Sequence, residues 1–174
     1  MSELDTFDLM RILRDNDQRL RETEVKERSG HIPGFTSFYA TGTFTPQYEG
    51  FATAGTWTYS VQSGFYTRIG NRCSFNLSLT ATARTVVPAG AALISHLPFT
   101  SDATANSHSP VTLDTIDSIT LSGTIVQLTA RIPPGKTYIE FIEVLGTGPS
   151  AAAQLAATGF SATATVRVSG QYMV

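Results

Sequence analysis

The stretch GFYTRIGNRCSFNLSL, residues 64–79, decides the fold class of this chain. Apolar and polar side chains alternate on both sides of Ile69-Gly70-Asn71-Arg72, and alternation with period two is typical of half-buried strands. A Gly-Asn pair between two such runs indicates a tight hairpin turn. We therefore predict a β-hairpin whose two arms share one apolar face, made of Phe65, Ile69, Cys73, Phe75 and Leu77.

The overall composition fits a β-rich protein that carries little charge. Charged residues make up 15% of the 174 residues, against roughly 25% in an average soluble domain. The net charge of −2 gives no electrostatic reason to expect a nucleic-acid partner. The length allows one ordinary domain with an appendage and a core of its own.

Neither membrane insertion nor a secretion signal is expected. No stretch approaches the roughly 20 continuous apolar residues that span a bilayer. The N-terminus mixes acidic and apolar residues, whereas a signal peptide is basic and then apolar, so we expect synthesis and folding in a cytosol. The single cysteine, Cys73, excludes an intrachain disulfide. Being in phase with Phe75 and Leu77, it is expected to be a small buried hydrophobe, with a reactive thiol as the alternative.

Charge is concentrated at the N-terminus, where 14 of the 26 charged residues lie within residues 1–28. This segment has neither Gly nor Pro between residues 3 and 27, so it is predicted to be an α-helix. Its apolar positions fit a heptad repeat with a narrow seam, which favours an oligomeric coiled coil over one amphipathic helix packed on the downstream domain. The seam residues are Leu9, Leu13, Asn16 and Leu20.

Residues 29–40 are rich in turn formers and are predicted to be a neck leading to a β-domain, residues 41–174, called the head from here on. Short alternating runs separated by turns are typical of an antiparallel sandwich or barrel. Residues 46–50 are predicted to be a turn and Ser101–Pro110 an exposed polar loop, while Ala151–Ala157 is either a helical turn or an edge strand. The predicted strands are Ser37–Phe44, Thr56–Gln62, Phe65–Ile69, Cys73–Thr82, Ala92–Leu97, Ser118–Leu121, Thr124–Ile132, Tyr138–Leu145 and Ala162–Met173.

The head carries no catalytic or metal-binding signature, so we expect neither enzymatic activity nor a cofactor. Glu140 and Glu143 stand three apart in a predicted strand and point to opposite faces, which prevents the paired carboxylates of glycoside hydrolysis. Asp114 and Asp117 lie in a predicted loop, where turn formation is the expected role. The histidines are far apart and lack metal-ligand spacing, and neither a nucleophile-elbow nor a phosphate-loop motif occurs.

Ligand binding is therefore the expected activity of the head. Trp57 shares a predicted face with Tyr59 and Val61, so it is expected in the core more than as a platform for a sugar ring. On the hairpin, the face opposite the apolar one is expected to be a plain solvated sheet face, with a polar-aromatic patch that contacts a ligand as the alternative. The polar loop adds further candidates. The candidate ligand-contacting residues are Tyr66, Arg68, Asn76, Asp102, Asn106 and His108.

Three motifs resemble the C-terminal domains of bacteriophage tail-fibre and related virion-spike proteins. They are a Gly-Thr-aromatic-Thr-Pro opening at residues 42–46, a Gly-x-Tyr-Thr-Lys/Arg-Ile-Gly-Asn hairpin at residues 64–71, and Leu-Pro-Phe after a strand at residues 97–99. The resemblance covers residues 41–174. It consists of structural signals and includes no catalytic signature.

This resemblance implies a jelly-roll β-sandwich that assembles as a homotrimer on a virion and attaches it to a host-surface polysaccharide. In such fibres a preceding helix commonly trimerises the heads. The N-terminal seam would then be a trimeric coiled coil that also anchors the chain to capsid or tail proteins, and the virion would assemble in the host cytoplasm. A helix of about 38 Å, at roughly 1.5 Å per residue, is shorter than a typical fibre shaft. The alternative function is a capsid decoration protein that stabilises the particle without binding a receptor, and an enzyme acting on polysaccharide is the least favoured.

Overall fold

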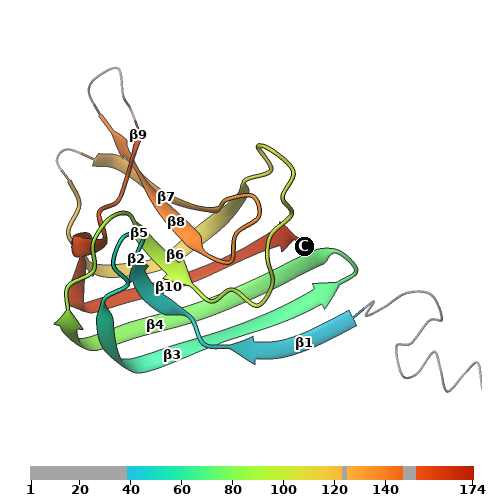
Figure 1. Ribbon diagram of the computed structural model, residues 1–174, viewed down its shortest axis with the longest axis horizontal. Coiled ribbons are helices and arrows are strands. Elements are labelled where there is room, and N and C mark those ends of the chain that lie inside the picture. Colours follow the sequence, from blue (N-terminus) through green and yellow to red (C-terminus); the bar gives the residue numbers. More distant parts are fainter. Residues whose placement is uncertain (1–38, 123–124, 147–151) are drawn as a thin grey trace, which may run out of the picture. The chain divides into compact units, whose positions relative to one another are not determined.

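The computed structural model describes residues 39–122, 125–146 and 152–174 (Figure 1). The predicted coiled coil, with its seam of Leu9, Leu13, Asn16 and Leu20, and the neck up to residue 38 lie outside the described residues. Within the described ranges, the regular structure consists of strands and one short 3₁₀ helix, so the mainly β class is confirmed. The elements are β1 (Tyr39–Phe44), β2 (Gln47–Gly50), β3 (Thr56–Ile69), β4 (Arg72–Val86), β5 (Ala92–Ser95), β6 (Ser109–Ile119), β7 (Ile125–Ile132), β8 (Ile139–Leu145), β9 (Ala152–Gln154), η1 (Ala157–Gly159) and β10 (Phe160–Met173).

All ten strands belong to one sheet, in the order β1-β3-β4-β10-β6-β7-β8-β5-β2, with β9 beside β8. The last strand in the chain, β10, lies in the middle of this order between β4 and β6. It pairs antiparallel with both neighbours over most of its length. The centre of the sheet is therefore built from strands that are far apart in the sequence.

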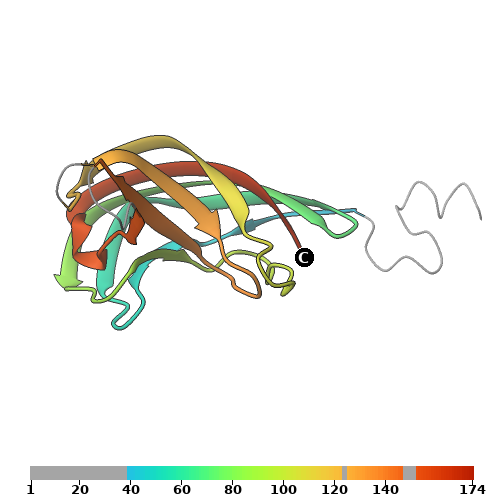
Figure 2. The same ribbon diagram turned by 90° about the horizontal axis from the view of Figure 1, so that it is seen from above.

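The two edges of the sheet are joined by a very short connection. β1 and β2 are consecutive in the chain and separated only by Thr45 and Pro46, yet they lie at opposite ends of the strand order. Three Cα steps separate Phe44 from Gln47, so these residues lie no more than about 11 Å apart. The sheet must therefore curl far enough to bring the end of β1 close to the start of β2, and Figure 2 shows the resulting half-barrel.

Side chains from β3 close the seam of this half-barrel beside β2. The Tyr48 N–H donates a hydrogen bond to the Tyr59 hydroxyl at 2.9 Å, and the Gln62 side-chain amide donates to the Pro46 carbonyl at 3.0 Å. The two facing sheets of the predicted jelly-roll sandwich are thus replaced by a single curled sheet. Local alternation could not distinguish one curled sheet from two facing sheets. The difference depends on the pairings of β10 with β6 and of β6 with β7, which join the strands into one sheet.

Aromatic rings fill the interior of the half-barrel. Tyr48 is 1% exposed, and its one hydroxyl hydrogen is shared between the carbonyls of Leu79 on β4 and Ala164 on β10, whose oxygens lie 3.2 and 3.3 Å away. Its ring packs against those of Phe160 and Trp57. These contacts tie the β2 edge to the centre of the sheet, and burial raises the pKa of the Tyr48 hydroxyl.

The opening hairpin is confirmed, but the prediction of its shared apolar face is wrong. The turn consists of Gly70, with φ of 60°, and Asn71. A two-residue turn sets Ile69 directly opposite Arg72, so odd positions of β3 share a face with even positions of β4. Cys73, Phe75 and Leu77 are buried as predicted, whereas Phe65 and Ile69 are 45% and 52% exposed on the other face. The inner face of this hairpin instead receives Tyr66, Arg68 and Gly64, which lie opposite Phe75, Cys73 and Leu77.

A bulge explains why the β3 alternation changes phase. Between Tyr59 and Val61 the register with β4 shifts, leaving Ser60 as an extra residue. Val61 consequently points outward and is 40% exposed, so the predicted face of Trp57, Tyr59 and Val61 breaks after Tyr59. The core position expected for Trp57 is confirmed, since it packs against the buried cluster and stacks under the Arg84 guanidinium at 5.4 Å.

Two further predictions differ from the structure. The predicted turn at residues 46–50 contains β2, whose residues alternate between half-buried and buried. The predicted strand at 118–121 is replaced by β6, which starts at Ser109 and places Asp114 and Asp117 in a strand. The outer positions of β6 face solvent and are polar. The strand therefore has few apolar residues, and a search for alternating hydrophobicity does not recognise it.

Candidate functional site

The polar loop between β5 and β6 is fastened to the rest of the head at several backbone positions. The N–H groups of Leu97 and Ser101 donate to carbonyls of the β7–β8 turn, at 2.9 Å each, and the Asp102 N–H donates to the Met173 carbonyl at 2.8 Å. The buried Ser101 hydroxyl donates to the Pro133 carbonyl at 2.6 Å. The loop therefore has a fixed base from which its exposed residues project.

Tyr66 and Arg68 hold this base through Phe99. The rings of Tyr66 and Phe99 meet edge to face at 5.1 Å, and the Arg68 guanidinium lies 5.0 Å from the Phe99 ring centre. The Tyr172 hydroxyl donates to the Phe99 carbonyl at 3.1 Å and accepts from its N–H at 3.2 Å. Tyr66 and Arg68 thus lie on the inner face as supports of the loop, and they do not share a surface patch with Asn76.

The exposed part of the loop is ordered by its own side chains. The Asp102 carboxylate accepts hydrogen bonds from the Thr104 N–H and hydroxyl, both at 2.7 Å, and these bonds lower the pKa of Asp102. The Ser107 hydroxyl donates to the Thr104 carbonyl at 2.7 Å. Asn106 adopts a positive φ of 65°, which Asn tolerates better than most residues. Asp102, Asn106 and the exposed His108 therefore sit on one shaped loop.

An open polar groove lies on the outer face of the sheet, the face turned away from the core. Its volume is about 400 Å³, and it crosses β4, β10 and β6. Ser74 pairs with Gln171, and in the next row Asn76 pairs with Ser169, which in turn pairs with Thr112. These rows present hydroxyl and amide groups side by side on three neighbouring strands.

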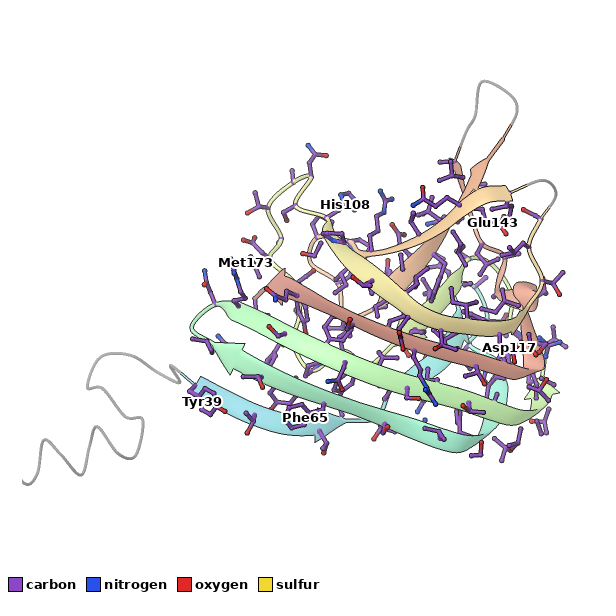
Figure 3. The ribbon with its side chains drawn as sticks, turned by 180° about the vertical axis from the view of Figure 1, so that it is seen from behind. Tyr39, Phe65, His108, Asp117, Glu143 and Met173 are labelled. Atoms are coloured by element: carbon purple, nitrogen blue, oxygen red, sulfur yellow. The ribbon has the colours of Figure 1, made fainter. Side chains whose placement is uncertain are left out.

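The groove continues toward the end of the sheet that carries the polar loop. A smaller hollow of about 190 Å³ is lined by Arg72, Ser109, Gln171 and Met173, among others. His108 precedes Ser109, and Figure 3 shows His108 and Met173 at this same end. On the other side of the groove the exposed Arg167 pairs with Ser78. The outer surface therefore offers hydroxyls and amides with an arginine at either end.

The structure divides the sequence-predicted site residues into two groups. Asn76 pairs with the groove residue Ser169 and His108 lies near the end of the groove, while Asp102 and Asn106 belong to the loop that Tyr66 and Arg68 support. Sequence reasoning missed the groove residues on β6 and β10, because their adjacency to β4 depends on long-range strand order. A weak signal was present: the predicted strand 162–173 alternates, so its polar positions had to face solvent. The missed residues are Thr112, Ser169 and Gln171.

The two glutamates of β8 are both buried, and each is occupied by a different partner. Glu140 is 5% exposed; it forms an ion pair with Arg131 at 2.5 Å and accepts from the Gln154 amide at 2.9 Å. Glu143 is fully buried and accepts hydrogen bonds from the Ser122 N–H, at 2.9 Å, and from its hydroxyl. The carboxylates therefore serve as anchors for neighbouring strands and loops.

The described residues were also considered for a metal site and a membrane-spanning helix, and they form neither. Within them, no three His, Cys, Asp or Glu side chains are grouped so that they could hold a metal ion. The same ranges include no helix with the length and apolar character needed to cross a bilayer.

Comparison with known proteins gave a likeness in structure. No protein-family model matches the chain, and a search of curated proteins found no match. The crystal structure of the Dettilon tailspike protein is similar, with a TM-score of 0.61 and 20% sequence identity over 78% of this chain. The head folds like part of a tailspike. The match spans 24% of the tailspike, so the likeness concerns one segment of that longer protein.

Proposed function

We propose that this chain is a virion spike protein of a bacteriophage or phage-like particle, and that its head binds a host-surface glycan. The observation that carries the proposal is the likeness to a tailspike over 78% of the chain. The motifs at residues 42–46, 64–71 and 97–99 support the same assignment from the sequence side.

In this proposal the chain is a homotrimer. The seam of Leu9, Leu13, Asn16 and Leu20 forms a three-stranded coiled coil that joins the heads and attaches them to capsid or tail proteins. Asn16 at a core position would set the register and the number of strands. Three linked heads gain avidity for a repetitive surface even if each single site is weak.

The outer groove is the proposed glycan site. Sugar hydroxyls exchange hydrogen bonds with hydroxyl and amide groups, which Ser74, Asn76, Thr112, Ser169 and Gln171 present on adjacent strands. Rigid strands hold these groups in place, so little ordering entropy opposes binding. Arg72 and Arg167 flank the rows at opposite ends, and this charge favours a polysaccharide that carries carboxylate or other anionic groups.

The test is binding of purified host-surface polysaccharides to the full chain, measured by calorimetry. Gln171→Ala should reduce affinity at least fivefold, because the amide lines both the groove and the adjoining hollow and can bond to sugar hydroxyls there. Gln127→Ala on β7, an exposed amide outside the groove, is the matched control and should leave affinity unchanged. Arg167→Gln should weaken the binding of acidic polysaccharides and leave the binding of neutral ones unchanged.

The other two functions are alternative outcomes of this test. If no polysaccharide or intact host cell is bound, and particles lacking the protein adsorb normally but lose heat stability, the chain is a decoration protein. If purified polysaccharide is shortened on incubation with the full chain, the expectation that it is no enzyme is wrong.

A further inference from the structure

The outer groove carries an arginine at each of its two ends. Arg72 lines the hollow at the loop end of the sheet and pairs with Met173 of β10, whereas Arg167 lies further back on β10 itself and pairs with Ser78. Arg167 and Met173 are six residues apart on one strand, and a strand rises about 3.3 Å per residue. The two arginines are therefore separated by about 20 Å along β10.

Each of these guanidinium groups can attract an anionic group of its own. Arg72 and Arg167 are both exposed. Within the described ranges, the carboxylates that form ion pairs do so with Arg131 and His96, so neither groove arginine is neutralised by one of them. At physiological salt, exposed charges more than about 8–10 Å apart are largely screened from one another. One anionic group therefore cannot serve both arginines.

The polar positions between the two arginines follow the direction of β10. Ser169 and Gln171 line the groove, and Gln171 also lines the adjoining hollow. Across the sheet the polar positions end at β4, because β3 presents the half-exposed Phe65 and Ile69 beside it on the outer face. On the other side Pro110 of β6 lines the groove. A long polar ligand therefore meets more hydrogen-bonding groups when it lies parallel to β10 than when it crosses the strands.

Exposed carboxylates lie just outside this span at both ends. Asp117 pairs with Thr165, which is the next outer residue of β10 beyond Arg167. At the other end the Asp102 N–H donates a hydrogen bond to the Met173 carbonyl. Both aspartates are exposed, so they repel anionic groups of a ligand, whereas the arginines attract such groups within the span. The charges therefore limit the favourable contacts with an anionic ligand to the stretch between the two arginines.

We propose that the groove binds an extended stretch of a linear acidic polysaccharide, which lies along β10 and places one anionic group on Arg72 and another on Arg167. The inference rests on the proposed function, since it specifies the ligand of the same site. Once one anionic group is bound, the sugar chain holds the second near its arginine at a high effective concentration. The site therefore selects polymers with anionic groups about 20 Å apart, and it binds short fragments and single acidic sugars weakly.

A length series of one polyuronate tests the span. Polymannuronate carries a carboxylate on every sugar, so it offers two charges at the required separation, and its hydrolysis fragments can be separated by length. Calorimetry with the full chain should show an affinity that rises at least tenfold once the extended fragment exceeds about 20 Å. A smooth rise with length overturns the two-arginine contact, and so does binding of a neutral polysaccharide without binding of polymannuronate; the glycan function stands in both cases. If no polysaccharide is bound, the proposed function fails and this inference fails with it.

Removal of each charge gives the second measurement. Arg72→Gln and Arg167→Gln should each abolish the rise in affinity, because the remaining arginine binds short and long fragments alike. Lys136→Gln removes an exposed cation of the β7–β8 turn that lines neither hollow, and it should preserve the rise. Circular dichroism verifies that each variant folds. A rise that survives either arginine variant overturns the proposal, because it then comes from contacts elsewhere, such as a fragment that bridges two copies.

Discussion

The inner and outer faces of the same strands differ in burial and in the residues they carry. On the inner face of β4 and β10, residues such as Phe75, Leu79 and Val166 are buried and belong to one hydrophobic cluster. On the outer face, positions one residue away carry Ser, Thr, Asn and Gln that contact mainly solvent. The inner face therefore specifies the fold, and the outer face is free to evolve surfaces for partners.

The largest effect should come from truncating an inner aromatic residue. Phe160 is fully buried and packs against the rings of Tyr48 and Phe141. Phe160→Ala should lower the free energy of unfolding by about 3–5 kcal/mol, through lost burial and the cavity it leaves. Denaturant unfolding measures the change. The exposed Phe51 is the matched control, and Phe51→Ala should change stability by less than about 0.5 kcal/mol. Equal losses of stability for the two variants would contradict the view that the inner face specifies the fold.

A smaller effect should follow from removing a hydroxyl that serves a buried carboxylate. Ser122→Ala deletes the side-chain donor to Glu143 and should cost about 1.5–3 kcal/mol, as for hydrogen bonds to charged groups. Ser78→Ala on the outer face of β4 should stay within about 0.5 kcal/mol. Thermal unfolding of both variants makes the comparison, and a neutral Ser122→Ala would mean that Glu143 is not an anchor.

The smallest effect near neutral pH concerns the buried tyrosine hydroxyls, whose stabilising contribution is lost only at alkaline pH. Burial raises the pKa of the hydroxyls of Tyr48 and Tyr172, and it raises that of Tyr59 to about 12. An unfolded tyrosine ionises near pH 10, so the folded state binds more protons above that pH. The stability contribution of these groups is fully present below pH 10 and falls as pH rises toward 12. Because one pKa unit corresponds to about 1.4 kcal/mol, each group that stays protonated in the folded state lowers the free energy of unfolding by about that amount for every pH unit above 10.

Unfolding monitored against pH, with tyrosinate absorbance as a second signal, checks this expectation. Tyr172→Phe should make the decline above pH 10 shallower, while costing about 1 kcal/mol at neutral pH for the lost bonds to Phe99. A wild-type stability that is constant up to pH 12 would contradict the burial of these hydroxyls.

Much of the secondary structure could be predicted from local patterns. The Gly70-Asn71 turn, the burial of Cys73 and the strands now labelled β5, β7, β8 and β10 follow from turn chemistry and alternation. The face of β3 could not be read from alternation alone, because a bulge at Ser60 changes the phase of the strand. The two-residue turn itself implied the correct pairing of Ile69 with Arg72, and the apolar character of Phe65 and Ile69 obscured it.

The candidate site was predictable only in part, for a physical reason. Asp102, Asn106 and His108 share one loop, so their proximity is local and could be anticipated. Strand order places Asn76 beside the groove residues Ser169 and Thr112, and the hydrophobicity of any single strand does not encode that order. Tyr66 and Arg68 are predicted on one exposed patch with Asn76, but they lie on the inner face, because Phe99, the residue they hold, is about 30 positions away in the sequence.

The central place of β10 also has a consequence for how the protein is made. Val166 pairs with Leu79, 87 positions earlier in the chain, and β10 separates β4 from β6. Until residues 160–173 have left the ribosome, β4 and β6 both lack β10 as a partner, and the central strand of the half-barrel is missing. Pairings this distant in sequence slow folding. The apolar strands of the nascent head stay exposed during this time. The yield of folded protein would therefore depend on chaperones and on the speed of translation.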